Sequence, residues 1–188
     1  MIRQTLIVTA TLILICSAPA ALAREGAYFA FSLGQSQTET NNTSYASIGY
    51  SALLGVQFDP NVALEIEYIN HGEMDDDRNN KIAASSRSLW LVLLEPLSPY
   101  TSLYVKIGGA QVNSVMSGAS LTGISNSLSS MPYGLGLQYE LSRNTALRLF
   151  AESGYNYQVN GTTGTVATTT YNFSGGIYRI GLASMYAF

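Results

Sequence analysis

Beyond its N-terminal segment, the chain consists of short stretches in which every second residue is apolar. In "VALEIEYIN" (62–70), Leu64 and Ile66 alternate with Glu65 and Glu67. A period of two is typical of β-strands, because successive side chains point to opposite faces of a sheet. Eight stretches of this kind are predicted strands: 26–34, 45–58, 62–71, 86–95, 101–112, 131–141, 145–156 and 171–188. The pattern therefore predicts an all-β protein.

The composition is unusual for a protein that is surrounded by water. Charged residues make up 11% of the chain, against roughly 25% in soluble domains, while the chain has 13 Tyr and 17 Gly. The longest purely apolar run in the strand region is "LWLVLL" (89–94), which is much shorter than the roughly 20 residues of a membrane-spanning helix. In lipid, a closed barrel is the only β-structure that satisfies every backbone polar group.

The connections between the predicted strands alternate in length. Three are short, at 59–61, 96–100 and 142–144, and four are long and polar, at about 35–44, 71–86, 113–130 and 157–170. Outer-membrane barrels have short periplasmic turns and longer extracellular loops. The sequence therefore predicts an eight-stranded antiparallel up-and-down transmembrane β-barrel over residues 24–188, with both of its ends in the periplasm.

The N-terminal segment has the composition of an export signal. Arg3 precedes the apolar stretch "LIVTATLILIC", and the small residues "SAPAALA" follow it. This order predicts a secretory signal peptide over residues 1–23, with cleavage after Ala23, in preference to a transmembrane helix, for which the apolar stretch is short. Cys16, the only cysteine, lies within this segment, so we expect no disulfide in the exported chain.

Charged residues on the predicted strands fall on the face opposite to the large apolar residues. The inward set is Glu65, Glu67, Lys106, Glu140, Arg148, Glu152 and Arg179. Charges at bilayer depth must pair or meet water, and eight strands enclose little more than side chains. The mixed signs predict a salt-bridged network that plugs the barrel, with a small gated pore as the alternative.

The fourth predicted strand is harder to interpret. "SLWLVLLEP" (88–96) is apolar on both faces, so its register stays open. We expect Arg87 and Glu95 to join the inward charged set.

Two hairpins resemble those of a known family. "YGLGLQYELSRNTALRLFAESGY" (133–155) and "SIGYSALLGVQFDPNVALEIEY" (47–68) resemble hairpins of the OmpA-like small outer-membrane β-barrels. In layout the resemblance extends over the whole predicted barrel. It implies a Gram-negative outer membrane, with lipids and lipopolysaccharide around the wall. Some relatives carry a peptidoglycan-binding domain after the barrel, which we expect to be absent because the chain ends at Phe188.

The last predicted strand ends on an aromatic residue. Its lipid-facing set is Tyr178, Ile180, Leu182, Tyr186 and Phe188, with Ser184 as an exception. A terminal Phe after such alternation resembles the sorting signal that the barrel assembly machinery reads. The same residues also suit the aromatic girdle at the periplasmic boundary.

Two weaker patterns were weighed for chemistry. Some small outer-membrane barrels modify lipid A with Ser, His and acidic groups. Here His71, the only histidine, is expected near the outer rim, with Glu73, Ser85 and Ser86 close in sequence. A Gly-x-Ser-x-Gly turn, which would expose a nucleophilic serine, is absent from the sequence. The sequence therefore predicts no catalytic site.

The stretch "DDDRNN" (75–80) has Asp75, Asp77 and Asn79 at the spacing of a calcium loop. Its sixth position is not Gly and its twelfth is Ser86 instead of Glu, so we predict a solvated loop, with ion bridging to lipopolysaccharide as an alternative. The net charge of −3 and the lack of a basic patch argue against a nucleic-acid partner.

We expect a non-catalytic outer-membrane barrel without a cofactor. Its role would be structural or surface-interacting, in adhesion or envelope integrity, through loops that contact a host or cell-surface ligand. A small gated pore and a lipid A-modifying enzyme are the alternatives.

Overall fold

The computed structural model describes residues 26–40, 43–75, 81–118, 121–163 and 169–188. The strands are β1 (Gly26–Thr40), β2 (Thr43–Asp59), β3 (Val62–Asp75), β4 (Lys81–Pro96), β5 (Thr101–Gly118), β6 (Leu121–Ser130), β7 (Tyr133–Glu140), β8 (Thr145–Thr163) and β9 (Thr169–Ala187). In these ranges, no helix is long and apolar enough to cross a membrane. The predicted signal peptide, residues 1–23, lies outside them.

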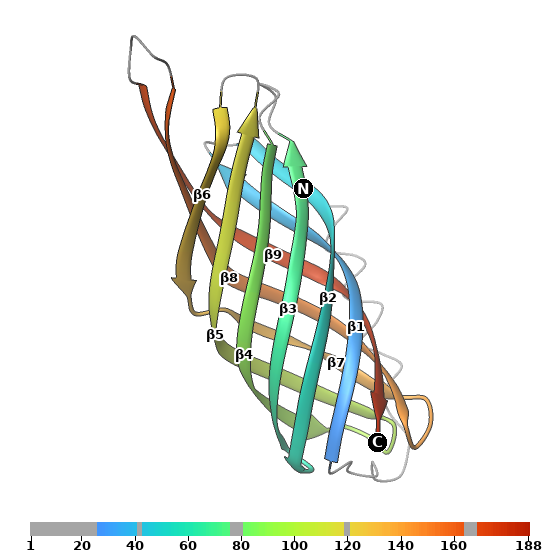
Figure 1. Cartoon of the computed structure of the whole chain (residues 1–188). Helices are drawn as coiled ribbons and strands as arrows, with labels where there is room; N and C mark the ends of the chain where they lie inside the picture. Colours follow the sequence, from blue (N-terminus) through green and yellow to red (C-terminus); the bar gives the residue numbers. More distant parts are fainter. Residues whose placement is uncertain (1–25, 41–42, 76–80, 119–120, 164–168) are drawn as a thin grey trace.

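Antiparallel pairing closes the sheet into a barrel (Figure 1). β1 pairs with β2 on one side and with β9 on the other, so the first and last strands complete the wall. β6 and β7 are two parts of one wall strand, because each pairs with a different half of β5. Counted together they give an eight-stranded barrel, which confirms the predicted architecture.

Met131 and Pro132 interrupt this divided strand. Proline has no amide hydrogen for the ladder, but the Pro132 carbonyl accepts the Gly108 amide at 3.0 Å and so stays attached to β5. Beyond this point β6 has no ladder with β8. The Ser130 hydroxyl replaces part of it, since it donates to the Asn156 carbonyl at 3.1 Å and accepts from the Asn156 amide at 3.0 Å.

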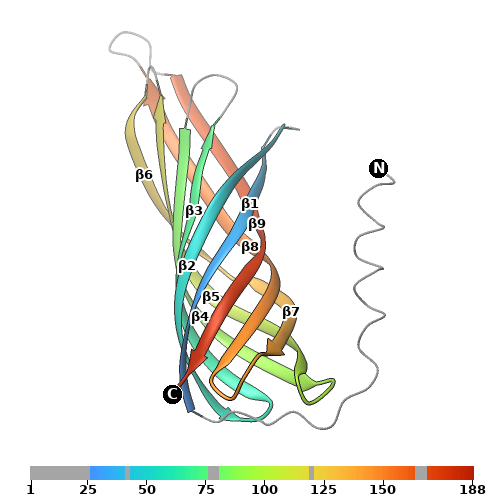
Figure 2. The same ribbon diagram turned by 90° about the vertical axis from the view of Figure 1, so that its right-hand side faces the viewer.

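The strands continue far into the connections that were predicted to be long loops. β1 extends to Thr40 and β2 already begins at Thr43, while residues 121–130 form β6. Figure 2 shows these hairpins at the end of the barrel opposite to the C-terminus. The loop prediction was wrong here because a strand that leaves the membrane no longer needs an apolar face, so the period-two pattern disappears while backbone pairing continues. The three short turns lie as predicted.

Burial separates the two faces of the wall. On β7, Tyr133 and Leu135 are 59% and 58% exposed, whereas Gly134 and Gly136 face inward. On β4, Trp90 and Val92 are fully buried, and Leu89 and Leu91 face outward. This alternation settles the register that the sequence left open.

The expectation that Arg87 and Glu95 face the interior was wrong, because both lie on the outward face of β4. From Arg87 to Glu95 the strand rises about 27 Å at about 3.4 Å per residue, or about 21 Å along the membrane normal for a tilt of about 40°. The apolar band of such barrels is about 25 Å tall. The two charges therefore lie at opposite boundaries of the lipid-facing band, with only leucines facing outward between them.

Barrel closure can be tested with paired cysteines. Leu33 on β1 and Leu182 on β9 are directly opposed, and such Cα atoms lie about 4.5–5.5 Å apart, a distance that suits a disulfide. In a Cys16→Ser chain, Leu33→Cys with Leu182→Cys should cross-link on oxidation, as measured by the gel mobility of the unfolded protein. The control pair, Leu33→Cys with Ile180→Cys, is displaced by two residues and about 7–8 Å apart. It should stay reduced, and a cross-link in the control alone would show a different register.

Candidate functional site

Six of the seven charged residues predicted to face inward form buried ion pairs. They are Glu65, Glu67, Lys106, Arg148, Glu152 and Arg179. The seventh, Glu140, is half-buried near the short turns, where it accepts a hydrogen bond from Gln138 Nε2 at 2.6 Å. The ion pairs divide into two groups along the barrel.

The group nearer the short turns is centred on Arg148. Its Nη1 donates to Glu65 Oε1, which also accepts the Tyr28 hydroxyl at 2.6 Å. Arg148 Nε donates to Gln138 Oε1 at 2.7 Å, and the guanidinium carbon lies 4.9 Å from the centre of the Tyr104 ring, within the range of a cation–π interaction. Arg148 is therefore held by a carboxylate, an amide and an aromatic ring together.

The second group contains two cations that bridge the same two carboxylates. Lys106 Nζ lies 2.6 Å from Glu152 and 3.3 Å from Glu67. Arg179 Nη1 lies 3.3 Å from each of these two carboxylates. Because every member contacts two partners of opposite sign, each charge is balanced from two sides.

Both groups extend across the barrel. Glu65 and Glu67 lie on β3, whereas Arg148 and Glu152 lie on β8, and the order of strands places β3 and β8 on opposite sides of the wall. The Arg148–Glu65 pair therefore spans the interior directly. In the second group, Lys106 and Arg179 connect the same two sides.

Neutral donors complete the second group. Glu67 accepts the Ser51 hydroxyl at 2.6 Å and Trp90 Nε1 at 3.0 Å, and Glu152 accepts the Tyr155 hydroxyl at 2.8 Å. Lys106 Nζ lies 4.1 Å from the centre of the Trp90 ring. These contacts supply part of what buried charges lose when they leave water.

The sequence analysis missed these neutral partners. Tyr28 could have been found, because it alternates with the outward Phe29 and Phe31 on its strand. Trp90 could not, because both faces of β4 are apolar and no pattern distinguishes them.

Taken together, the two groups carry no net charge, since three carboxylates pair with three cations. A buried ion pair that loses one member leaves an uncompensated charge, which costs about 3–5 kcal/mol. The geometry therefore favours side chains that stay in place over side chains that swing aside.

His71 faces the interior of the barrel, three residues beyond Tyr68 toward the hairpins. It is fully buried, with Nε2 3.0 Å from Ser86 Oγ and Nδ1 3.5 Å from Ser36 Oγ. A register shift between Asn70 and Gly72 turns Glu73 to the outside. Glu73 pairs there with Lys81.

This shift separates the residues that were weighed for catalysis. His71 and Ser86 are in contact, but Glu73 lies on the other face of the wall, and Ser85 is next to Ser86 with the opposite parity. A β-bulge inserts one extra residue and so reverses the face of every later side chain on its strand. The alternation of the sequence does not show where such a residue lies.

The predicted assembly signal is exposed on the lipid-facing side, at Tyr178, Ile180, Leu182 and Tyr186 of β9 and at Phe188 directly after it. The Phe188 ring lies 5.8 Å from the rings of Phe29 and Tyr186, and its amide donates to the Ala27 carbonyl at 3.1 Å. These contacts suit an aromatic girdle. A role in sorting stays a prediction.

The candidate calcium loop cannot be placed, because Asp77 and Asn79 lie outside the described residues. Among the residues that are described, no three His, Cys, Asp or Glu side chains could hold a metal ion together.

Arg148 provides a test of the interior ion pairs. Arg148→Ala should lower the free energy of unfolding in urea by about 3–5 kcal/mol, because Glu65 is then buried without its partner. The control Arg143→Ala removes the same charge from an exposed turn and should change stability by less than about 0.5 kcal/mol. Adding Glu65→Gln to Arg148→Ala should restore part of the loss. Equal stability of the two single variants would contradict the interior position of Arg148.

The fold and the interior can be compared with known proteins. Solved structures with a similar fold include Neisserial surface protein A (NspA), with 12% identity, 87% of this chain and 97% of that chain covered, and a TM-score of 0.62. The N-terminal β-barrel domain of OprF from Pseudomonas aeruginosa has 16% identity, coverage of 88% and 100%, and a TM-score of 0.57. OprG from the same organism has 9% identity, coverage of 91% and 99%, and a TM-score of 0.64. At such identities the likeness shows the fold alone.

No curated protein sequence matches the chain. The model of the outer membrane protein β-barrel domain family matches residues 7–178. Because this match covers most of the chain, the protein belongs to the outer membrane protein β-barrel domain family and is a protein of the outer membrane.

Proposed function

We propose that the protein is a closed, non-catalytic barrel with a structural or surface-interaction role, in adhesion or envelope integrity. The observation that carries the proposal is the pair of ionic groups that join β3 to β8 across the interior. An eight-stranded barrel has space for little beyond its own side chains. Here those side chains are paired with each other, so the interior serves to hold the wall together.

A pore is less well supported by this arrangement. An ion that crosses the barrel would have to pass the Arg148–Glu65 pair and then the level at which Lys106 and Arg179 bridge Glu67 and Glu152. All of these side chains are buried. Opening both levels would break several charge-assisted contacts at once.

The proposed surface role depends on the hairpins at the end of the barrel opposite to the short turns, above all on the β8–β9 hairpin. β9 pairs with β1 only from Ile177 to Ala187, while residues 169–176 pair with β8 alone. The β8–β9 hairpin therefore projects beyond the closed wall as a two-stranded ribbon (Figure 1). With the short turns in the periplasm, this ribbon reaches outward from the cell and offers backbone and side chains to a ligand.

Planar-bilayer recording tests the closed barrel. The refolded protein should show no stable conductance steps. A variant with Glu67→Ala and Arg179→Ala removes two side chains that meet inside the barrel and should produce steps if it stays folded. The control, Glu73→Ala with Lys81→Ala, removes an exposed pair and should stay silent. Steps in the unaltered protein whose ion selectivity changes with Lys106→Gln would support the gated pore instead.

Labelling of intact cells tests the orientation. Ser174 is exposed on the β8–β9 ribbon, and Ser142 is exposed in a short turn at the other end. In a Cys16→Ser chain, Ser174→Cys should react with a membrane-impermeant maleimide on whole cells. Ser142→Cys should react only after the cells are opened, because the outer membrane shields the periplasm. The reverse pattern would show that the short turns face outward.

A further inference from the structure

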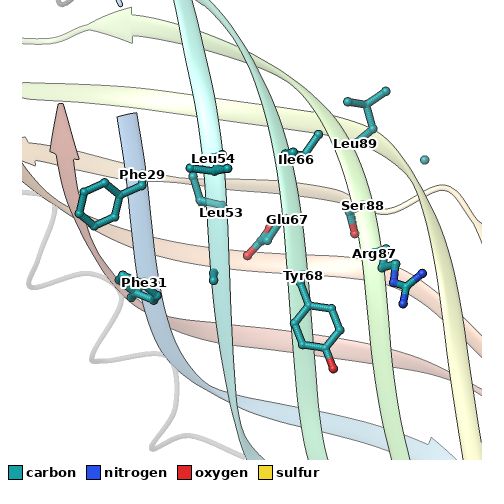
Figure 3. Close-up of a pocket in the computed structure, with 12 residues that line it drawn as sticks. Phe29, Phe31, Leu53, Leu54, Ile66, Glu67, Tyr68, Arg87, Ser88 and Leu89 are labelled. Carbon is teal, nitrogen blue, oxygen red and sulfur yellow. The ribbon is translucent and has the colours of Figure 1, made fainter. Parts of the chain in front are cut away.

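The outer wall has a groove of about 760 Å³ that crosses β1 to β5 (Figure 3). Two rows of side chains line the groove. Each row runs from strand to strand, because its members are register partners. The row nearer the hairpins is Phe31, Ala52, Tyr68 and Arg87. The second row, nearer the short turns, is Phe29, Leu54, Ile66, Leu89 and Gly109.

Two small residues make room within these rows. Ala52 lies between Phe31 and Tyr68, and Gly109 is the partner of Leu89 on the next strand. A Cβ atom added at Gly109 would have no atom within 4 Å. The hollow is therefore open on the lipid side, and its outward-facing lining is apolar except for the Tyr68 hydroxyl and Arg87.

Arg87 is unusual among the described cations. Lys106, Arg148 and Arg179 pair inside the barrel, and Lys81 pairs with Glu73. Arg143 lies in a turn at the opposite end. Arg87 is exposed and forms no ion pair with any residue that the structure describes. Figure 3 shows its guanidinium extending from the wall beside Tyr68.

The depth of Arg87 matches a membrane boundary. Its partner Tyr68 is the last outward apolar residue of β3 before Asn70 and Glu73. Tyrosines with one apolar and one wet end are enriched at such boundaries. On β4, the outward residues on the short-turn side of Arg87 are leucines, whereas those on the hairpin side are the smaller or charged Ser85, Ala83 and Lys81. A cation without an ion-pair partner among the described residues meets, at this position, the layer in which lipid headgroups lie.

We propose that this groove binds an outer-leaflet lipid of the lipid A type, with a phosphate on Arg87 and an acyl chain along the hollow toward Gly109. A guanidinium presents two parallel N–H donors that match a phosphate. The apolar rows below it match hydrocarbon. The site therefore matches a single molecule that carries both an anionic headgroup and an acyl chain. In a membrane the headgroup lies at the surface and the chain lies below it, which is the order of Arg87 and the apolar rows. The site depends on the orientation proposed above, but not on whether the barrel is closed.

Binding of lipid A to the refolded protein in detergent micelles tests the site, with native mass spectrometry as the measurement. Arg87→Gln should weaken binding by about tenfold or more, since it removes a charge-assisted contact. Lys81→Gln is the matched control, because it removes a cation from the same strand that already pairs with Glu73. It should change binding by less than about twofold. Lipid A without phosphates should bind the original protein as weakly as the phosphorylated form binds Arg87→Gln.

The hollow is tested separately. Gly109→Trp places a large side chain in the open space and should also weaken binding by about tenfold, by excluding the chain, whereas Gly109→Ala should leave it unchanged. Each variant is first checked for the mobility shift on boiling that a folded barrel shows. If Arg87→Gln does not fold, Arg87→Lys keeps the charge without the paired donors and should bind with intermediate affinity.

Three kinds of outcome would overturn the proposal. One is a sign of general charge attraction, shown either by an equal loss for Arg87→Gln and Lys81→Gln or by equal binding of phosphatidylglycerol and lipid A. Another is lipid binding that Gly109→Trp leaves intact. The third is a change of oligomeric mass in Gly109→Trp without a change in bound lipid, which would assign the groove to a second copy of the chain. Because micelles have no inside or outside, a failure here is distinct from a failure of the proposed orientation.

Discussion

Pairing of charges across a narrow interior is the interaction on which the rest of this structure depends. A barrel in lipid places many of its large apolar side chains outside, and the core here combines apolar residues such as Val92 and Leu94 with small, hydroxyl, aromatic and charged ones. Arg148 with Glu65, and Lys106 and Arg179 with Glu67 and Glu152, fill that core without a net charge. Four of the five ion pairs join strands that are not neighbours in the sheet, and so add to the closure that the β1–β9 ladder provides. The exception is Arg179 with Glu152, which are register partners on the neighbouring strands β9 and β8.

The same constraint explains why the two ends of the barrel differ. At the short-turn end and through the membrane, the wall has an apolar exterior and one register shift, between Gln57 and Asp59. Toward the hairpins the wall changes at four places: the Met131–Pro132 interruption and the register shifts between Asn70 and Gly72, between Met116 and Gly118, and between Glu152 and Tyr155. The shifts at Asn70–Gly72 and at Glu152–Tyr155 change which side chains face inward, as the first does for His71 and Glu73. The hairpin end is thus the one where the regular pattern stops and where individual shapes can form.

The outward charges of β4 show how the charged interior and the lipid-facing wall are connected. Arg87 and Glu95 bracket a run of leucines, and neither enters the interior, because the inward face of that strand is occupied by Trp90, Val92 and Leu94. Trp90 is itself part of the core, since its indole donates to Glu67. A strand that is apolar on both faces therefore serves both sides: one face supports the charge pairs, and the other meets lipid and contributes to the groove beside Arg87.

Much of the architecture was readable from the sequence by itself. Alternation of apolar and polar residues, low charge and strictly alternating connection lengths led to an eight-stranded barrel, and the charges of β3, β5, β8 and β9 could be assigned to one face because each shares a parity with small residues. What only the tertiary structure decided was how those charges pair, where β4 places Arg87 and Glu95, and that His71 lies inside. The reason is physical. Parity tells which face a residue occupies, but partners across the barrel come from strands far apart in the chain, a strand apolar on both faces has no parity to read, and a single bulge reverses the faces beyond it.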